Sequence, residues 1–217
     1  INSTNSLHLG GTFTNMGGLY VGTEDGSKAG LLELNAGGNL INSSHVNVYA
    51  GSTLRNAGTI DSTGVIAVRD GASLTNSGTI TLSGRLMNVG TIRNTAGTIT
   101  LDPNTRAVFQ NGPEKPGDRT EGSFENAGTL TIGLDCTFEN TGFFTNNGTI
   151  TLSGGQLLNL GRVENGMNHS LTLEKGAAIQ NGGKQASDTP VTFTNQGTLT
   201  IGLGCKFENT GSFTNEG

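Results

Sequence analysis

Tryptophan is absent from this sequence of 217 residues, only 32% of the residues are hydrophobic, and only 13% are charged. So small a hydrophobic supply argues against an ordinary globular domain built around one large core. Disordered chains are poor in β-branched residues and highly charged, whereas Thr, Ile, Val and Leu alternate here along the whole sequence. The sequence therefore predicts an ordered chain. Its 36 Gly fall at regular intervals and indicate many tight turns.

Basic clusters and long apolar runs are also missing. The net charge is -5 and Lys and Arg are scattered, so nucleic acid is not an expected partner. No apolar run approaches the roughly 18 residues of a membrane span, so we do not expect the chain to cross a membrane. It opens at Ile1 without a signal segment and ends at Gly217 inside a repeat. We therefore expect a fragment of a longer repeat protein, with targeting signals outside it.

The sequence repeats one phrase closely. FENAGTLTIGLDCTFENTGFFTNNG (124–148) and FTNQGTLTIGLGCKFENTGSFTNEG (193–217) are identical at 19 of 25 positions. Inside them Asn recurs about every 20 residues in two interleaved series, which are Asn126, Asn146, Asn165, Asn195 and Asn215, and Asn111, Asn140, Asn159, Asn181 and Asn209. Between these marks lie runs of period two that are too short for helices and are bounded by Gly. Three short strands per 20 residues predict one coil of a β-solenoid.

The residue two places before each marking Asn is expected to point inward with it. A regular coil contains two marking Asn, one of each series, which we call the first and the second mark. Before the first mark the inward residues are Phe13, Leu54, Leu74, Ile92, Phe124, Phe144, Val163, Phe193 and Phe213. Before the second mark they are Leu86, Phe109, Phe138, Leu157, Ile179 and Phe207. Both columns are apolar throughout, as stacked coils require, because each coil covers the inner face of the next.

Two points stay open at the level of sequence. The marking Asn is either an inward amide that stacks on its neighbours or a residue that tolerates the left-handed turn conformation before Gly. The first coils depart from the later register, because Glu33 stands two places before Asn35. Between Asn42 and Asn94 the marks can be threaded in two ways that differ by one face of the solenoid.

The phrase Leu/Phe-x-Asn-x-Gly-Thr-Ile/Leu, as in LTNSGTITL, LRNAGTI and FTNQGTLTI, resembles the repeats of filamentous-haemagglutinin-like and autotransporter-type bacterial adhesins. The resemblance runs from Phe13 to Gly217. It implies a secreted or cell-surface protein and a right-handed parallel β-helix, and it transfers no catalytic residue. We expect an all-β fold, with residues 1–217 forming a single domain of about 9–10 coils, roughly 45 Å long at the spacing of β-strands.

The spacing of the marks predicts two insertions at one corner, three coils apart, at 112–122 and 182–190. Long surface loops often carry binding residues, so the polar side chains of these loops are candidate contacts for a cell-surface protein or glycan of a host or of bacteria. They are Glu114, Lys115, Asp118, Arg119, Glu121, Lys184, Gln185 and Asp188. Drift after duplication of the repeated unit explains the insertions equally well.

The outward residues of one strand form a second pattern. In six successive coils they read Thr79/Thr81, Thr98/Thr100, Thr129/Thr131, Thr149/Thr151, Ser170/Thr172 and Thr198/Thr200. Stacked on a flat sheet, such pairs resemble the ice-binding face of β-solenoid antifreeze proteins, which makes ice binding an alternative function. Thr is also simply a strong strand former that suits half-exposed positions. The array breaks at Asp61.

Catalysis is not expected, and neither a cofactor nor a metal site is expected. The carboxylates Asp61, Asp70, Asp102, Asp118, Asp135 and Asp188 are scattered, mostly at turns, where Asp is common for conformational reasons. His8, His45 and His169 are isolated, and no spacing of Cys and His fits zinc. A carbohydrate-active enzyme whose carboxylates meet only in the fold is a second alternative.

Cys136 and Cys205 occupy equivalent places in the repeat. Three coils, about 14 Å, should separate them, which is too far for a disulfide. We expect two free, buried thiols. We also expect the open terminal coils to promote end-to-end self-association.

Overall fold

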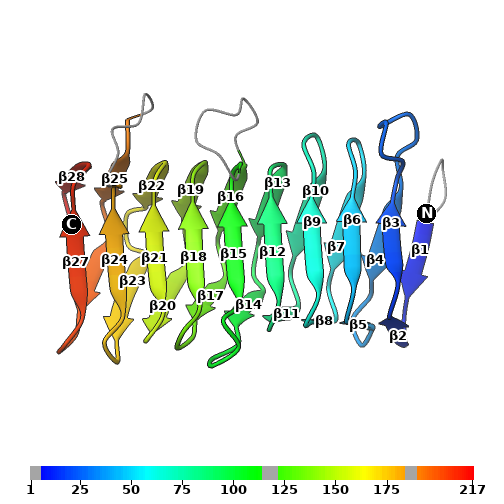
Figure 1. Cartoon of the computed structure of the whole chain (residues 1–217), viewed down its shortest axis with the longest axis horizontal. Helices are drawn as coiled ribbons and strands as arrows, with labels where there is room; N and C mark the ends of the chain where they lie inside the picture. The colour runs from blue at the N-terminus through cyan, green and yellow to red at the C-terminus, as the bar shows by residue number, and fades with distance from the viewer. Residues whose placement is uncertain (1–5, 114–121, 184–189) are drawn as a thin grey trace.

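The computed structural model describes residues 6–113, 122–183 and 190–217, and it forms a right-handed parallel β-helix. The coils stack side by side along a rod, with the N-terminus and the C-terminus at opposite ends (Figure 1). Each coil contributes one strand to each of three parallel sheets, which we call sheets A, B and C. The predicted solenoid with three short strands per coil is confirmed. Nothing in the described part of the chain is a helix that could cross a bilayer.

The strands are short and regularly spaced. Sheet A has ten, in the order β1 (Ser6–Leu9), β4 (Leu31–Leu34), β7 (Thr53–Asn56), β10 (Ser73–Asn76), β13 (Thr91–Asn94), β16 (Ser123–Asn126), β19 (Phe143–Asn146), β22 (Arg162–Asn165), β25 (Thr192–Asn195) and β28 (Ser212–Asn215). Sheet B has nine, in the order β2 (Thr12–Asn15), β5 (Asn39–Asn42), β8 (Thr59–Ser62), β11 (Thr79–Leu82), β14 (Thr98–Leu101), β17 (Thr129–Ile132), β20 (Thr149–Ser153), β23 (Ser170–Glu174) and β26 (Thr198–Ile201). Sheet C also has nine, in the order β3 (Gly18–Val21), β6 (His45–Val48), β9 (Val65–Val68), β12 (Arg85–Asn88), β15 (Val108–Asn111), β18 (Thr137–Asn140), β21 (Gln156–Asn159), β24 (Ala178–Asn181) and β27 (Lys206–Asn209). The described strands thus form nine three-stranded coils and the first strand of a tenth.

The second and fourth residues of each four-residue strand point inward, and the first and third point outward. The inward second residues build a continuous core that is almost wholly buried between the ends of the rod. Its bulkiest part is a cluster of rings, in which Phe138 lies with its ring centroid 4.8 Å from those of Phe109 and Phe144. The inward orientation predicted for both series is confirmed, and Phe13 also packs against the core, although its strand belongs to sheet B.

The marking Asn point inward and stack. On sheet A each Nδ2 donates to the Oδ1 of the next coil over 2.6–2.8 Å, from Asn56 to Asn215. On sheet C the same ladder runs from Asn88 to Asn209 over 2.6–2.8 Å. None of these Asn has a positive φ among the described residues. The inward-amide interpretation is therefore confirmed, and the rod has a polar, hydrogen-bonded seam along two of its sheets.

The first three coils follow a different pattern, so the predicted departure from the later register is confirmed, whereas the predicted place of Phe13 is wrong. Phe13 lies on sheet B and not on sheet A, and the early amide ladder runs there from Asn15 through Asn42 to Ser62. Asn35 is an exposed turn residue, and Leu34 takes the marking position of that coil. From Asn56 onward the marking Asn of the first series end strands of sheet A and, from Asn88 onward, those of the second series end strands of sheet C, which settles the threading.

Close packing of neighbouring coils explains the Gly that follows the marking Asn. A Cβ added to Gly78 would lie 2.1 Å from the carbonyl oxygen of Gly58, and one added to Gly128 would lie 2.1 Å from that of Gly97. The backbones of successive turns therefore stack directly on one another at this corner. No larger residue fits there without moving a coil.

Candidate functional site

The corner between sheets C and A carries the longest connections of the rod. In most coils this connection is short, as between Asn140 at the end of β18 and Phe143 at the start of β19. It is longer between β15 and β16 and between β24 and β25, where the sequence predicts the insertions at 112–122 and 182–190. A third long connection, at 22–30, joins β3 to β4 at the same corner and leaves the same edge of the rod (Figure 1). This connection was not predicted from the sequence, because the spacing of the marking Asn is not followed in the first coils.

The predicted contact residues themselves lie outside the described residues. They are Glu114, Lys115, Asp118, Arg119, Glu121, Lys184, Gln185 and Asp188. The structure describes the bases of both insertions but does not test the predicted role of these side chains.

Each insertion is fastened at its base by a Thr of the following coil. Thr141 Oγ1 donates to the carbonyl oxygens of Pro113 at 2.9 Å and Asn111 at 3.3 Å. Thr210, the equivalent residue of the repeated phrase, lies 3.4 Å from Gly183 O and 3.5 Å from Asn181 O. The shared phrase thus supplies the same anchor beneath both insertions. Each insertion begins at a Gly with positive φ, which is 107° at Gly112 and 99° at Gly182.

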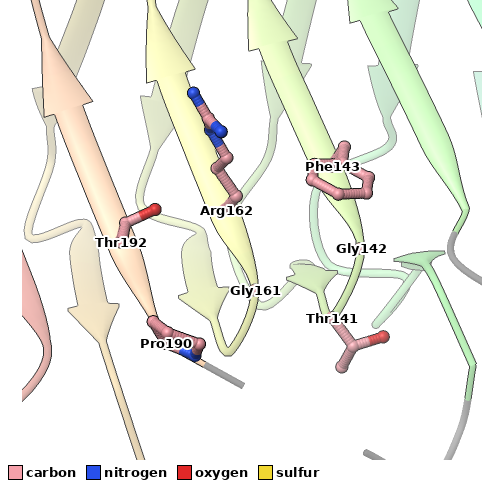
Figure 2. Close-up of a pocket in the computed structure, with 7 residues that line it drawn as sticks. All are labelled: Thr141, Gly142, Phe143, Gly161, Arg162, Pro190 and Thr192. Atoms are coloured by element: carbon pink, nitrogen blue, oxygen red, sulfur yellow. The ribbon is translucent and has the colours of Figure 1, made fainter. Parts of the chain in front are cut away.

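A hollow of about 230 Å³ lies at this corner between the two anchored bases. Figure 2 shows the residues that line it, which are Thr141, Gly142, Phe143, Gly161, Arg162, Pro190 and Thr192. Thr141 also anchors the first insertion, and Pro190 is where the chain returns from the second. The hollow therefore adjoins both insertions.

Phe143 and Arg162 are unusual for their column. They are the outward first residues of β19 and β22 and are paired in register. The same place in the other strands of sheet A holds Leu31 once and otherwise Ser or Thr, namely Ser6, Thr53, Ser73, Thr91, Ser123, Thr192 and Ser212. Phe143 is 43% exposed and the Arg162 side chain is 59% exposed. An aromatic ring and a cation therefore replace two small hydroxyl residues beside the hollow.

Neither residue was predicted from the sequence as a contact, although the repeated phrase differs at Phe143. Phe143 stands where the second copy of the phrase has Ser212. The guanidinium of Arg162 lies 3.5 Å from Glu164 Oε2, which is longer than a charge-assisted hydrogen bond. Such an exposed pair contributes little and leaves Arg162 able to meet a second anion.

The connection at 22–30 is held together by its own side chains. Asp25 Oδ1 accepts hydrogen bonds from the hydroxyls of Thr23 at 2.6 Å and Ser27 at 2.7 Å, and from the Ser27 N–H at 3.0 Å. These bonds, led by the one from Thr23, lower the pKa of Asp25 to about 2. The carboxylate organises the turn and stays ionised.

The predicted Thr pairs all lie on the outer face of sheet B in direct register. Thr79 pairs with Thr98, Thr98 with Thr129, and Thr129 with Thr149, and the second column aligns in the same way down to Thr200. Thr81, Thr100, Thr131, Thr151, Thr172 and Thr198 complete the set. Asp61 faces outward beside Thr81 and interrupts the second column.

In the described part of the chain, the acidic residues and histidines are spread over separate turns and strands. Asp70, Asp102 and Asp135 lie in turns and Asp61 lies on β8, whereas Asp118 and Asp188 lie outside the described residues. His8 Nδ1 is 2.8 Å from Glu33 Oε2 on the outer face of sheet A. Within the described ranges, no group of three His, Cys, Asp or Glu side chains could hold a metal ion.

The two cysteines are free, three coils apart in the order of sheet C. Cys136 is buried, and its Sγ lies 3.1 Å from Asp102 O. Cys205 is only half-buried, contrary to expectation, because no complete coil covers it.

Comparison with known proteins gives little. No protein-family model matches the chain, and no curated protein matches it. Among solved structures, a crystal structure of a TibC-catalysed, hyper-glycosylated TibA fragment is similar over 97% of this chain and 91% of that chain, with 15% sequence identity and a TM-score of 0.18. So weak a likeness carries no argument, and the fold stands on the strand pairing of the chain itself.

Proposed function

We propose that this chain is a structural and binding segment of a secreted or cell-surface bacterial adhesin. In this proposal the stacked coils form a stiff rod, and the corner between sheets C and A contacts a cell-surface protein or glycan of a host or of other bacteria. The proposal assigns the chain no catalytic activity and no cofactor. Its strand pairing suits the role, because each internal strand is hydrogen-bonded on both sides and the rod resists bending.

One observation carries the proposal. Three long connections leave the rod at the same corner, and a hollow with an exposed ring and a cation lies between the bases of two of them. Insertions at a corner leave the stacked strands undisturbed, so that this corner can vary without loss of the fold. The concentration of such features on one edge favours a contact surface there.

The experiment compares two variants of the chain coupled to fluorescent beads, with cultured epithelial cells and bacterial cells as targets. The corner variant replaces 112–122 and 182–190 by the short Thr141–Gly142 turn. The matched control is Thr100→Lys with Thr131→Lys on sheet B, which forms neither side of that corner. We expect the intact chain and the control to bind alike, and the corner variant to bind at least fivefold less. Absence of binding by the intact chain, or full binding by the corner variant, contradicts the proposal.

Ice binding is a second candidate, and the register of the Thr pairs favours it. On strands spaced by about 4.8 Å, their hydroxyls and methyls form two regular columns. Ice grown with the intact chain and with the corner variant would then be faceted, whereas the Thr100→Lys, Thr131→Lys variant would leave ice unshaped. Unfaceted ice with the intact chain rules this function out.

A further inference from the structure

We infer that the hollow beside Phe143 and Arg162 is a subsite for one acidic sugar residue of a longer glycan, with Arg162 pairing with the sugar carboxylate and Phe143 packing against the sugar ring. This inference rests on the proposed binding role of the corner and names the ligand class. Phe143 and Arg162 are register partners on adjacent strands, and both side chains point out of sheet A (Figure 2).

The chemistry of the two side chains selects the ligand. A guanidinium presents parallel N–H donors that match both oxygens of a carboxylate. The face of an aromatic ring is electronegative and attracts the C–H groups of a sugar, which carry partial positive charge. Together they recognise a saturated sugar ring that presents a face of C–H groups and bears a carboxylate. Because Glu164 already lies 3.5 Å from Arg162, the sugar carboxylate is the second anion at this guanidinium, and repulsion by Glu164 disfavours a third.

The backbone at the hollow makes an extended peptide a poor occupant. A peptide gains most of its affinity at a sheet by adding a strand to an open edge. Here β19 pairs with β16 and β22, and β22 pairs with β25, so no edge is open. Recognition must come from side chains, and the hollow is lined by one ring, one guanidinium and the hydroxyl residues Thr141 and Thr192.

The size of the hollow indicates how much of the glycan it holds. At about 230 Å³ it is smaller than the roughly 300–1,000 Å³ of pockets that enclose a whole small ligand. It therefore accommodates one residue of a chain that continues along the corner. Affinity for a single monosaccharide should be low and should rise with the length of the oligosaccharide.

The test is calorimetric titration of the whole chain with trisaccharides that contain galacturonic acid, glucuronic acid or sialic acid, each beside its carboxyl-reduced form. We expect at least one acidic trisaccharide to bind tenfold or more tightly than its reduced form. Phe143→Ser, which installs the residue of the second repeat copy, and Arg162→Thr, which installs the residue of the next coil, should each lower this affinity at least fivefold. The inference is overturned if none of the acidic trisaccharides binds, if acidic and reduced forms bind equally, or if either variant binds as the intact chain does.

Arg93→Thr is the matched control. Arg93 also lies on the outer face of sheet A, is 56% exposed, and faces Glu125 Oε2 at 3.6 Å, so it repeats the environment of Arg162 without the ring and the hollow. Its replacement should leave trisaccharide binding unchanged. If Arg93→Thr lost as much affinity as Arg162→Thr, the effect would depend on net charge alone. If no trisaccharide binds while the intact chain still holds cells in the bead assay, the ligand class fails and the proposed function stands.

Discussion

Asn94 Nδ2 donates to Asn126 Oδ1 over 2.7 Å, although 32 residues separate them in sequence. The preceding step of the same ladder, from Asn76 to Asn94, spans 18 residues over 2.8 Å. The connection at 112–122 therefore leaves the rod without shifting the register of the coils. Local hydrogen bonds favour this direction of the ladder, because the Asn146 Oδ1 that accepts from Asn126 also accepts from the N–H of Gly148 at 3.3 Å.

Replacement of Asn126 by Ala should destabilise the rod. Asn126 accepts from Asn94 and donates to Asn146, and it is fully buried. Its loss leaves the Asn94 donor and the Asn146 acceptor each without a ladder partner in the interior, which costs about 1–3 kcal/mol. Urea unfolding followed by circular dichroism measures the change. Asn215→Ala, at the exposed end of the same ladder, serves as the control and should stay within about 0.5 kcal/mol of the intact chain.

Gly128→Ala should also destabilise, for a steric reason. The new methyl group would lie 2.1 Å from Gly97 O, so one turn has to move away from the next. Overpacking of this kind costs about 1–3 kcal/mol. Gly17→Ala is the matched control, because its methyl group would meet nothing within 4 Å. Equal melting temperatures for the two variants would show that the coils do not stack as tightly as described.

The fold was largely predictable from the sequence because each strand contains only two inward residues and the stacked coils repeat them. A strand is predicted wherever an apolar residue stands two places before Asn, as in Phe124 and Asn126 or in Phe138 and Asn140. Prediction failed in the first coils, where Leu34 replaces the amide and Asn35 in the adjacent turn imitates it. Asn serves both ladders and turns, so a single Asn does not fix the register.

The hollow was harder to predict than the fold. Phe143 and Arg162 lie 19 residues apart and become neighbours only once the coils are aligned. Their significance depends on the first residue of the other sheet A strands being almost always Ser or Thr, a comparison that requires the correct register through every coil. The two insertions with their polar residues, in contrast, were predictable from the number of residues between successive marking Asn alone.

The two thiols should differ in reactivity. Cys136 is fully buried, whereas Cys205 is half-buried beside the open end of the rod. Because a thiol must reach the reagent to react, Cys205 should be alkylated by iodoacetamide at least tenfold faster in the folded chain. Peptide mass spectrometry over a time course separates the two sites, and labelling in urea is the control that should equalise them. Equal rates in the native state would mean that the coil above Cys136 opens readily.

The C-terminal end of the rod should drive self-association. The strand β26 has a neighbour on one side only among the described strands, and its inward residue Ile201 is 47% exposed. An unpaired strand edge beside exposed apolar side chains is a template for another chain. We expect the sedimentation coefficient to rise with concentration, and Ile201→Lys to suppress the rise because a charge would then have to be buried at the contact. Thr200→Lys, which adds the same charge to the outward face of β26, should associate as the intact chain does. A chain that stays monomeric at millimolar concentration would contradict the association. Equal behaviour of the two Lys variants would place the contact away from Ile201.

Association should also protect Cys205 from alkylation as concentration rises, because the thiol lies at the same end of the rod. This gives an independent readout of which end of the rod is engaged.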